Sequence, residues 1–204
     1  MMRAPERECS GRMEPGEDLV VAGCIGQQGT RAFVTSLGSQ MAEWFSKGWL
    51  QDILNSRDAD VTAYQEQLQA LGVTEAEAAG EGGILTAIWN LSGAYRAGLS
   101  FKLRRIPVHQ AAIEICERCG CNPYRLWCGN CMVLVAENGG RIVEFFENLG
   151  IPAAVIGSVK EGIAREIHHG DETGYLERPR EDEVLRILGQ EKTEELKAAG
   201  ILTE

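Results

Sequence analysis

The sequence has no long uninterrupted run of apolar residues, and its first sixteen residues hold no apolar segment like that of a signal peptide. A membrane-spanning helix needs about 18 or more such residues in a row. Positive charge is also scarce, because 20 Lys and Arg face 30 Asp and Glu and the net charge is −10. Excess negative charge repels nucleic-acid phosphates and anionic membranes. We therefore expect a cytoplasmic protein whose partners include neither a membrane nor a nucleic acid.

Histidine is scarce, and no nucleophile stands in a recognisable catalytic arrangement. The chain contains three histidines, and no Ser, His and Asp occur at a spacing that would mark a catalytic set. His168 and His169 directly precede Gly170, a pattern typical of a solvated hairpin. The sequence therefore identifies no catalytic residue and leaves open whether the protein is an enzyme.

Cysteine, in contrast, is plentiful: the chain has seven. Five of them form the pattern C-x2-C-x-C-x6-C-x2-C between Cys116 and Cys131, although the gap between the two pairs is shorter than in zinc ribbons. Ala112, Cys116 and Cys119 recur at helical spacing on an apolar face, which favours structural thiols. The alternative is a zinc or redox site formed by Cys119, Cys121, Cys128 and Cys131.

A glycine-rich turn precedes the apolar run that starts at Ile84. Glycine lets the backbone approach a ligand closely, and the first turn of a helix leaves N–H donors unpaired. Such a helix start suits a phosphate or carboxylate. The pattern predicts nucleotide or phosphate binding, in which Glu81 either holds magnesium or caps the helix. The alternative is a tight loop that only packs on a neighbouring element. The predicted site residues are Gly80, Glu81, Gly82 and Gly83.

The chain divides into three parts. Residues 1–17 are rich in charge, proline and glycine and predict a flexible lead-in. Residues 18–190 alternate segments of strand and helix periodicity, and residues 191–204 predict a short terminal helix and tail. Two β-α-β sequences are predicted, over 99–136 and 132–159. We therefore expect an α/β (α+β) fold, partly ferredoxin-like, with one sheet and helices packed against it.

Several segments resemble those of one family, in the same order along the chain. They are 80–89 (GEGGILTAIW), 106–108 (IPV), 115–117 (ICE), 122–126 (NPYRL), 150–157 (GIPAAVIG) and 178–183 (RPREDE). The chain resembles the aminoimidazole ribonucleotide (AIR) synthase-related proteins. This family includes the hydrogenase maturation factor that dehydrates a carbamoyl group to cyanide. The resemblance covers roughly residues 18–188.

The resemblance implies a fold and a set of partners. The matching part is the C-terminal domain of such proteins, a three-layer α/β/α unit. Full-length members carry a preceding domain that supplies much of the ATP site and forms the dimer, and we expect that domain to be absent here. The implied cofactors are ATP and Mg. The implied partner is a separate N-terminal-type domain or a second copy of the chain.

Three departures from the family bear on activity. Glu77, Ala78 and Ala79 precede the turn, where the family commonly has His-Asp or Asp-Pro followed by Thr or Ser. Residues 127–131 (WCGNC) replace a Ser-Ser-Gly-Ser loop, and the final ILTE lacks the cysteine that carries the carbamoyl group. Cyanide-forming chemistry is therefore not expected. The alternative function is an interaction or dimerisation module that kept the fold and lost the chemistry, which exposed Trp44 and Trp49 would support.

Overall fold

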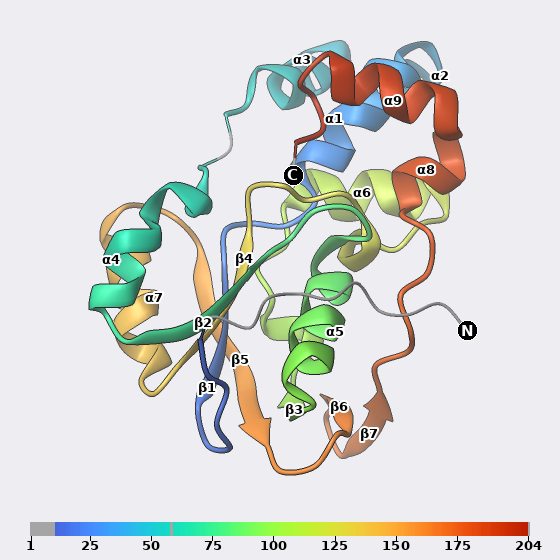
Figure 1. Cartoon of the computed structure of the whole chain (residues 1–204). Helices are drawn as coiled ribbons and strands as arrows, with labels where there is room; N and C mark the ends of the chain where they lie inside the picture. Colours follow the sequence, from blue (N-terminus) through green and yellow to red (C-terminus); the bar gives the residue numbers. More distant parts are fainter. Residues whose placement is uncertain (1–10, 58, 204) are drawn as a thin grey trace.

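A computed structural model describes residues 11–57 and 59–203 and shows a seven-stranded sheet (Figure 1). The strand order is β2-β4-β1-β5-β3-β6-β7, and β3 with β6 is the one parallel pair of neighbours among the described strands. The fold is therefore mixed α/β with a mostly antiparallel sheet. The strands are β1 Asp18–Ala22, β2 Val73–Ala78, β3 Gly98–Phe101, β4 Met132–Ala136, β5 Ala153–Lys160, β6 Arg165–His169 and β7 Glu172–Tyr175.

The helices lie in three places around the sheet (Figure 1). Helix α5 covers one face, α4 and α7 cover the other, and the remaining α-helices gather beyond one end of the sheet. No helix in the described part of the chain is long and apolar enough to cross a membrane. The helices are α1 Gln27–Ser36, α2 Gly38–Trp44, α3 Lys47–Asn55, η1 Val61–Tyr64, α4 Gln65–Ala70, α5 Gly83–Tyr95, η2 Leu103–Arg105, α6 Gln110–Cys119, η3 Pro123–Arg125, α7 Gly139–Asn148, α8 Glu183–Leu188 and α9 Gln190–Ala198, the η elements being 3-10 helices.

Strand β1 shows why both faces of the sheet are covered. Its side chains alternate between the faces, as they do in any strand. Leu19 and Val21 pack in the core beneath α5, whereas Val20 and Ala22 pack in the core beneath α4 and α7, and all four are fully buried. A third apolar core, which includes Phe33 of α1, joins the helices beyond the end of the sheet. The site described below lies where this helical core meets the sheet.

One of the two predicted β-α-β units is confirmed. Strands β4 and β5 both run antiparallel to β1, which lies between them, so they are parallel to each other and α7 connects them. The unit predicted over 99–136 is wrong, because β3 runs antiparallel to β4 and does not neighbour it. Periodicity identified the three strands of these two units correctly, but it carries no information on their direction or order in the sheet.

Strand β2 was not predicted from the sequence. Its residues VTEAEA contain two glutamates, which favoured a solvated surface. In the structure Glu75 is only 7% exposed and accepts a hydrogen bond from the Tyr95 hydroxyl. Pairing with the buried strand β4, more than fifty residues away in the sequence, makes this segment a strand. Helices α1 and α2 are separated by Leu37, which is the C-cap of α1 and the N-cap of α2.

Part of the predicted lead-in lies against the sheet. The N–H of Arg12 donates to the carbonyl of Thr74 in β2 (3.0 Å), and Met13 is buried. Residues 1–10 of that lead-in, and the final residue of the predicted tail, lie outside the described residues.

We predict that truncating one side chain beneath α7 strongly destabilises the protein. Phe146 is fully buried, so Phe146→Ala should lower the free energy of unfolding by about 3–5 kcal/mol through lost burial and a residual cavity. Leu149, one turn later and 45% exposed, is the matched control, and Leu149→Ala should cost less than about 1 kcal/mol. Urea denaturation measures both values, and similar losses for the two variants would contradict the assignment of this core.

Candidate functional site

The glycine turn connects β2 to α5. Gly82 and Gly83 both have left-handed backbone conformations, with φ of 80° and 66°. L-residues with a Cβ rarely adopt this region, so two successive glycines let the chain reverse into the first turn of α5. The carbonyl of Gly80 accepts hydrogen bonds from the N–H of Gly83 (3.1 Å) and from that of Cys128 (3.3 Å). The turn is therefore tied to the loop 127–131 that precedes β4.

Close packing explains the last glycine of the turn. A Cβ on Gly83 would lie 2.7 Å from the carbonyl oxygen of Tyr124 and 2.8 Å from that of Leu126. The α5 start thus presses directly against the backbone of η3 and of the residue that follows it. This geometry agrees with the packing interpretation of the motif, which the sequence left as an alternative.

The carboxylate of Asp182 accepts the hydrogen bond that the Gly82 N–H could otherwise donate to a ligand. The N–H of Gly82 donates to Oδ2 of Asp182 (2.7 Å), and the N–H of Val184 donates to Oδ1 of the same side chain (2.7 Å). Asp182 is 1% exposed and is also the N-cap of α8. Burial raises the pKa of this carboxyl to about 6, and nearby Glu81 also raises it, while the two hydrogen bonds act in the opposite direction.

Glu81 contacts helix α9 and does not cap α5. Its side chain is half exposed, and no side chain caps the start of α5. It forms an ion pair with Lys197 of α9 (3.8 Å), and the ammonium group of Lys197 lies 4.9 Å from the centre of the Trp127 ring. Glu81 therefore helps to hold α9 against the turn. Phosphate binding by Gly80, Glu81, Gly82 and Gly83 stays a prediction, and the structure adds that a phosphate at the Gly82 donor would compete with Asp182.

A pocket of about 490 Å³ lies on the other side of loop 127–131. Four segments that are distant in the sequence line it: helix α1, the link from α3 to η1, the loop itself and the C-terminal end of the described chain. Its described lining residues include two arginines, several amide and hydroxyl side chains and one carboxylate, in a protein whose net charge is −10. The lining residues are Gln28, Arg31, Arg57, Asp60, Thr62, Gly129, Asn130 and Thr203.

Gln28 organises one wall of this pocket. Its Oε1 accepts hydrogen bonds from the N–H of Gly129 (3.0 Å) and the N–H of Thr203 (3.3 Å), and its Nε2 donates to the Thr203 hydroxyl (2.7 Å). The indole N–H of Trp127 donates to the Thr203 carbonyl (2.8 Å). Loop 127–131 requires glycine at its centre, because a Cβ on Gly129 would lie 1.9 Å from that carbonyl oxygen. This wall is therefore fixed by satisfied hydrogen bonds.

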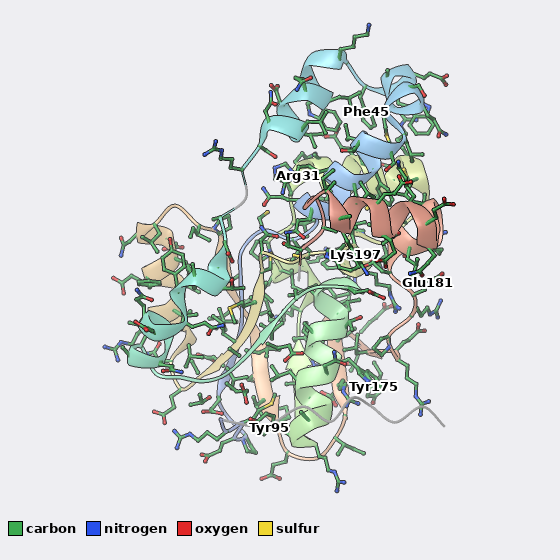
Figure 2. All side chains as sticks on the ribbon, turned by 45° about the horizontal axis from the view of Figure 1, so that its top comes forward. Arg31, Phe45, Tyr95, Tyr175, Glu181 and Lys197 are labelled. Carbon is green, nitrogen blue, oxygen red and sulfur yellow. The ribbon has the colours of Figure 1, made fainter. Side chains whose placement is uncertain are left out.

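The opposite wall carries the positive charge. Arg31 extends from α1, and its Nη1 donates to the carbonyl of Ser56 (2.7 Å), which fixes the link between α3 and η1 (Figure 2). Arg57 follows directly in that link. Asp60 caps η1 and accepts hydrogen bonds from the N–H and the hydroxyl of Thr62. An anion with several oxygens fits this arrangement, since guanidinium groups bind phosphate and carboxylate in a planar, bidentate manner.

The structure does not bring the four predicted metal-binding cysteines together. Cys128 and Cys131 lie in the core beneath α5, whereas Cys119 and Cys121 pack in the helical core with Cys116. Across residues 11–57 and 59–203, no three His, Cys, Asp or Glu side chains are arranged to hold a metal ion. The alternative of a zinc site therefore gains no support from the geometry.

Three of the thiols belong to the end of helix α6. The N–H of Cys121 donates to the carbonyl of Cys116 (2.9 Å) across Gly120, whose φ is 63°, as in a Schellman motif. A side-chain hydrogen bond with Cys121, followed by burial, raises the pKa of Cys116, and burial raises that of Cys119 to about 11. Both thiols therefore stay protonated near neutral pH, which suits a packing role better than a redox role.

No pattern in the sequence marks the pocket or Asp182 as parts of one site. Arg31, Arg57 and Gly129 share no motif or spacing, because they lie on separate segments. Asp182 did belong to the segment 178–183, which supported the family resemblance, but its role depends on a contact made 100 residues away in the chain. Gly26 and Gly29, which flank Gln28 closely in the sequence, are a local signal near the pocket.

Comparisons with known proteins identify the fold. No protein-family model matches the sequence, and no curated protein matches it. Among solved structures, the hydrogenase maturation protein HypE of E. coli is 21% identical with a TM-score of 0.67, and the match covers 89% of this chain and 55% of HypE. A HypE structure in complex with ATP is 16% identical with a TM-score of 0.65, covering 87% and 55%.

A second group of similar structures is the thiamine-monophosphate kinases. The Aquifex aeolicus enzyme, AaThiL, complexed with AMPPCP and TMP, is 19% identical with a TM-score of 0.54, and the match covers 79% of this chain and 51% of AaThiL. HypE has also been solved in a HypE–HypF complex. The chain thus has the fold of about half of HypE and ThiL, which confirms the resemblance at the level of the fold.

We predict that the glycines of the turn differ sharply in their tolerance of a side chain. Gly83→Ala should lower the free energy of unfolding by about 2–4 kcal/mol, because its φ is left-handed and a Cβ would overlap the η3 backbone. Gly80→Ala is the matched control. A Cβ there meets nothing within 4 Å, so its effect should stay within about 0.5 kcal/mol. Urea denaturation of both variants tests this, and an equal effect would contradict the close packing.

We predict that the protein loses stability through Asp182 as the pH rises. The folded pKa of about 6 exceeds the ordinary value of 3.8, so between these values the folded state keeps a proton that the unfolded state has released. The stabilising contribution of Asp182 to the free energy of unfolding is therefore fully present below about pH 4. It is lost as the pH rises through about 6, and the loss is on the order of 1–3 kcal/mol.

The check compares the wild type with Asp182→Asn, which does not titrate at this position. The stability of the wild type should fall relative to that of the variant between about pH 4 and about pH 7, as measured by urea denaturation at each pH. A stability difference that does not change over this range would contradict the raised pKa.

Proposed function

We propose that the protein binds a phosphorylated ligand of the nucleotide class in the pocket between α1 and loop 127–131. The observation that carries this proposal is the convergence of Arg31 and Arg57 on one hollow, whose described lining residues include one carboxylate, Asp60, in a strongly acidic protein. Charge-assisted hydrogen bonds from guanidinium groups to phosphate are among the strongest in proteins. The fixed wall around Gln28 reduces the cost of ordering the site when a ligand binds.

The similar structures support a nucleotide as the ligand. A HypE structure holds ATP, and AaThiL holds AMPPCP and TMP. Magnesium would accompany the phosphates, because Mg²⁺ is usually held by one or two carboxylates together with phosphate oxygens. Among the described residues that line the pocket, Asp60 is the carboxylate and is of the right ligand type. We assign no catalytic residue.

A second domain or chain would complete the site. The chain spans about half the length of HypE and of ThiL, and the pocket is open to solvent. In this proposal the glycine turn positions loop 127–131 through the Gly80 carbonyl. A phosphate would reach the Gly82 donor only by displacing Asp182.

A second candidate function is an interaction module of the same fold without a nucleotide. The buried carboxylate of Asp182 favours it, because the chain itself already occupies the anion position of the turn. Trp44 is 36% exposed, and Trp49 stacks on Phe45 with ring centres 4.5 Å apart, so this aromatic corner is partly available to a partner.

The two functions differ in what the arginines do. We expect Mg-ATP to bind the wild type in isothermal titration calorimetry, and Arg31→Gln or Arg57→Gln to weaken binding by about ten- to a hundredfold, as expected when a charge-assisted hydrogen bond is lost. Arg141→Gln is the matched control, since Arg141 is exposed on α7 and lies outside the pocket. It should bind as the wild type does.

Pyrophosphate is the second ligand to test. Equal affinity for pyrophosphate and ATP would restrict the proposal to a phosphate site, whereas tighter binding of ATP would support recognition of the nucleoside. Absence of binding by the wild type, or an equal loss in the Arg141→Gln variant, would contradict the proposed pocket and favour the interaction module.

A further inference from the structure

Asn130 makes contacts on both sides of the ligand pocket. It belongs to loop 127–131 and is only 5% exposed. Its Nδ2 donates to Oε1 of Gln27 in α1 (3.4 Å) and to the carbonyl of Ala59 (3.5 Å), which lies in the link between α3 and η1. Asn130 therefore connects the loop wall of the pocket to the link that contains Asp60.

The residues on either side of Asp60 are both bonded to Asn130. Ala59, directly before Asp60, accepts the side-chain hydrogen bond just described from a residue 71 positions away in the sequence. Val61, directly after Asp60, is fully buried, and its N–H donates to the backbone carbonyl of Asn130 (3.3 Å). The exposed side chain of Asp60 therefore extends from a backbone that is fixed on both sides.

The amide group of Asn130 has one orientation that satisfies all its neighbours. Its Oδ1 lies 3.8 Å from Sγ of Cys128 and 3.9 Å from Sγ of Cys131, and both thiols can donate to it. The carbonyl of Ala59 can only accept, so it requires the Nδ2 donor. An oxygen in place of Nδ2 would be repelled by that carbonyl. The bond to Ala59 therefore depends on an amide at position 130.

Asp60 has one carboxylate oxygen that is suited to a cation. Its Oδ1 accepts hydrogen bonds from the N–H (2.9 Å) and the hydroxyl (2.6 Å) of Thr62. In the described part of the chain, its Oδ2 takes part in no hydrogen bond or ion pair. Mg²⁺ prefers oxygen ligands and is usually held by one or two carboxylates together with phosphate oxygens. Asp60 therefore fits a magnesium ion that accompanies a nucleotide.

We propose that Asn130 is a positioning residue, which places Asp60 where it ligates the magnesium ion of a bound nucleotide. This inference rests on the nucleotide site proposed above. The hydrogen bond from Arg31 holds the start of the link at Ser56, and Asn130 holds its end. Groups that orient a metal ligand without touching the metal commonly change metal affinity by about 10- to 100-fold. The dependence of binding on Mg²⁺ is therefore the property that reports the role of Asn130.

Isothermal titration calorimetry of ATP with and without Mg²⁺ tests the proposal. We expect Mg²⁺ to raise the affinity of the wild type for ATP by at least about tenfold, and Asn130→Ala to remove most of this gain with a smaller change in the affinity for ATP alone. Gln27→Ala is the matched control, because it removes the other acceptor of the same amide and leaves the bond to Ala59. It should keep the gain.

Amide hydrogen exchange examines the same contacts without a ligand. We expect residues 57–62 to exchange at least about tenfold faster in Asn130→Ala than in the wild type or in Gln27→Ala. Asn130→Asp covers the case in which the alanine variant does not fold, since it keeps the size of the side chain and the acceptor for the two thiols. It should show the same faster exchange. Equal exchange in the wild type and the variants of Asn130 would overturn the positioning role.

The two measurements separate this inference from the proposed function. Binding of ATP that does not respond to Mg²⁺, or a gain that Asn130→Ala keeps, would overturn the inference and leave the phosphate site in place. A wild type that binds no ATP would instead overturn the nucleotide site itself, and with it the role of Asp60 toward magnesium.

Discussion

The rest of the site depends on one buried carboxylate. Asp182 accepts hydrogen bonds from Gly82 at the start of α5 and from Val184 at the start of α8, so one side chain fixes the first turns of two helices. A buried carboxyl group costs free energy unless its oxygens find donors, and here the two helix starts provide them. The last helices of the chain are thereby held against the end of the sheet.

The position of the last helices determines the shape of the pocket. Helix α9 places Lys197 over Trp127, and the residues after it bring Thr203 to Gln28 and to the Trp127 indole. These contacts fix loop 127–131, which forms one wall of the pocket. The arginine wall is set separately, by the hydrogen bond from Arg31 to Ser56. The pocket is therefore assembled from segments that only the folded chain brings together.

The pattern of neighbouring residues was sufficient to predict most helices and strands of the fold. The apolar strand 132–136, the helix that follows Asn138 and the helix end at Gly72 are each encoded within a few residues, and all are present. Strand β2 was missed because its partner β4 lies far away in the sequence, and its glutamates resemble a surface segment. The cysteine pattern suggested a metal site, but helix α6 and the loop before β4 direct the two pairs into different cores.

The sequence by itself determined the glycine turn, the alternation of strands and helices and the resemblance to a known fold, because propensity, periodicity and short motifs act over neighbouring residues. The tertiary structure alone decided the order and direction of the strands and the hydrogen bond from the Gly82 N–H to Asp182. It also decided that Arg31 and Arg57 line the same pocket. These features depend on contacts between distant segments. Such contacts follow from the burial of the whole chain, which no short stretch of sequence specifies.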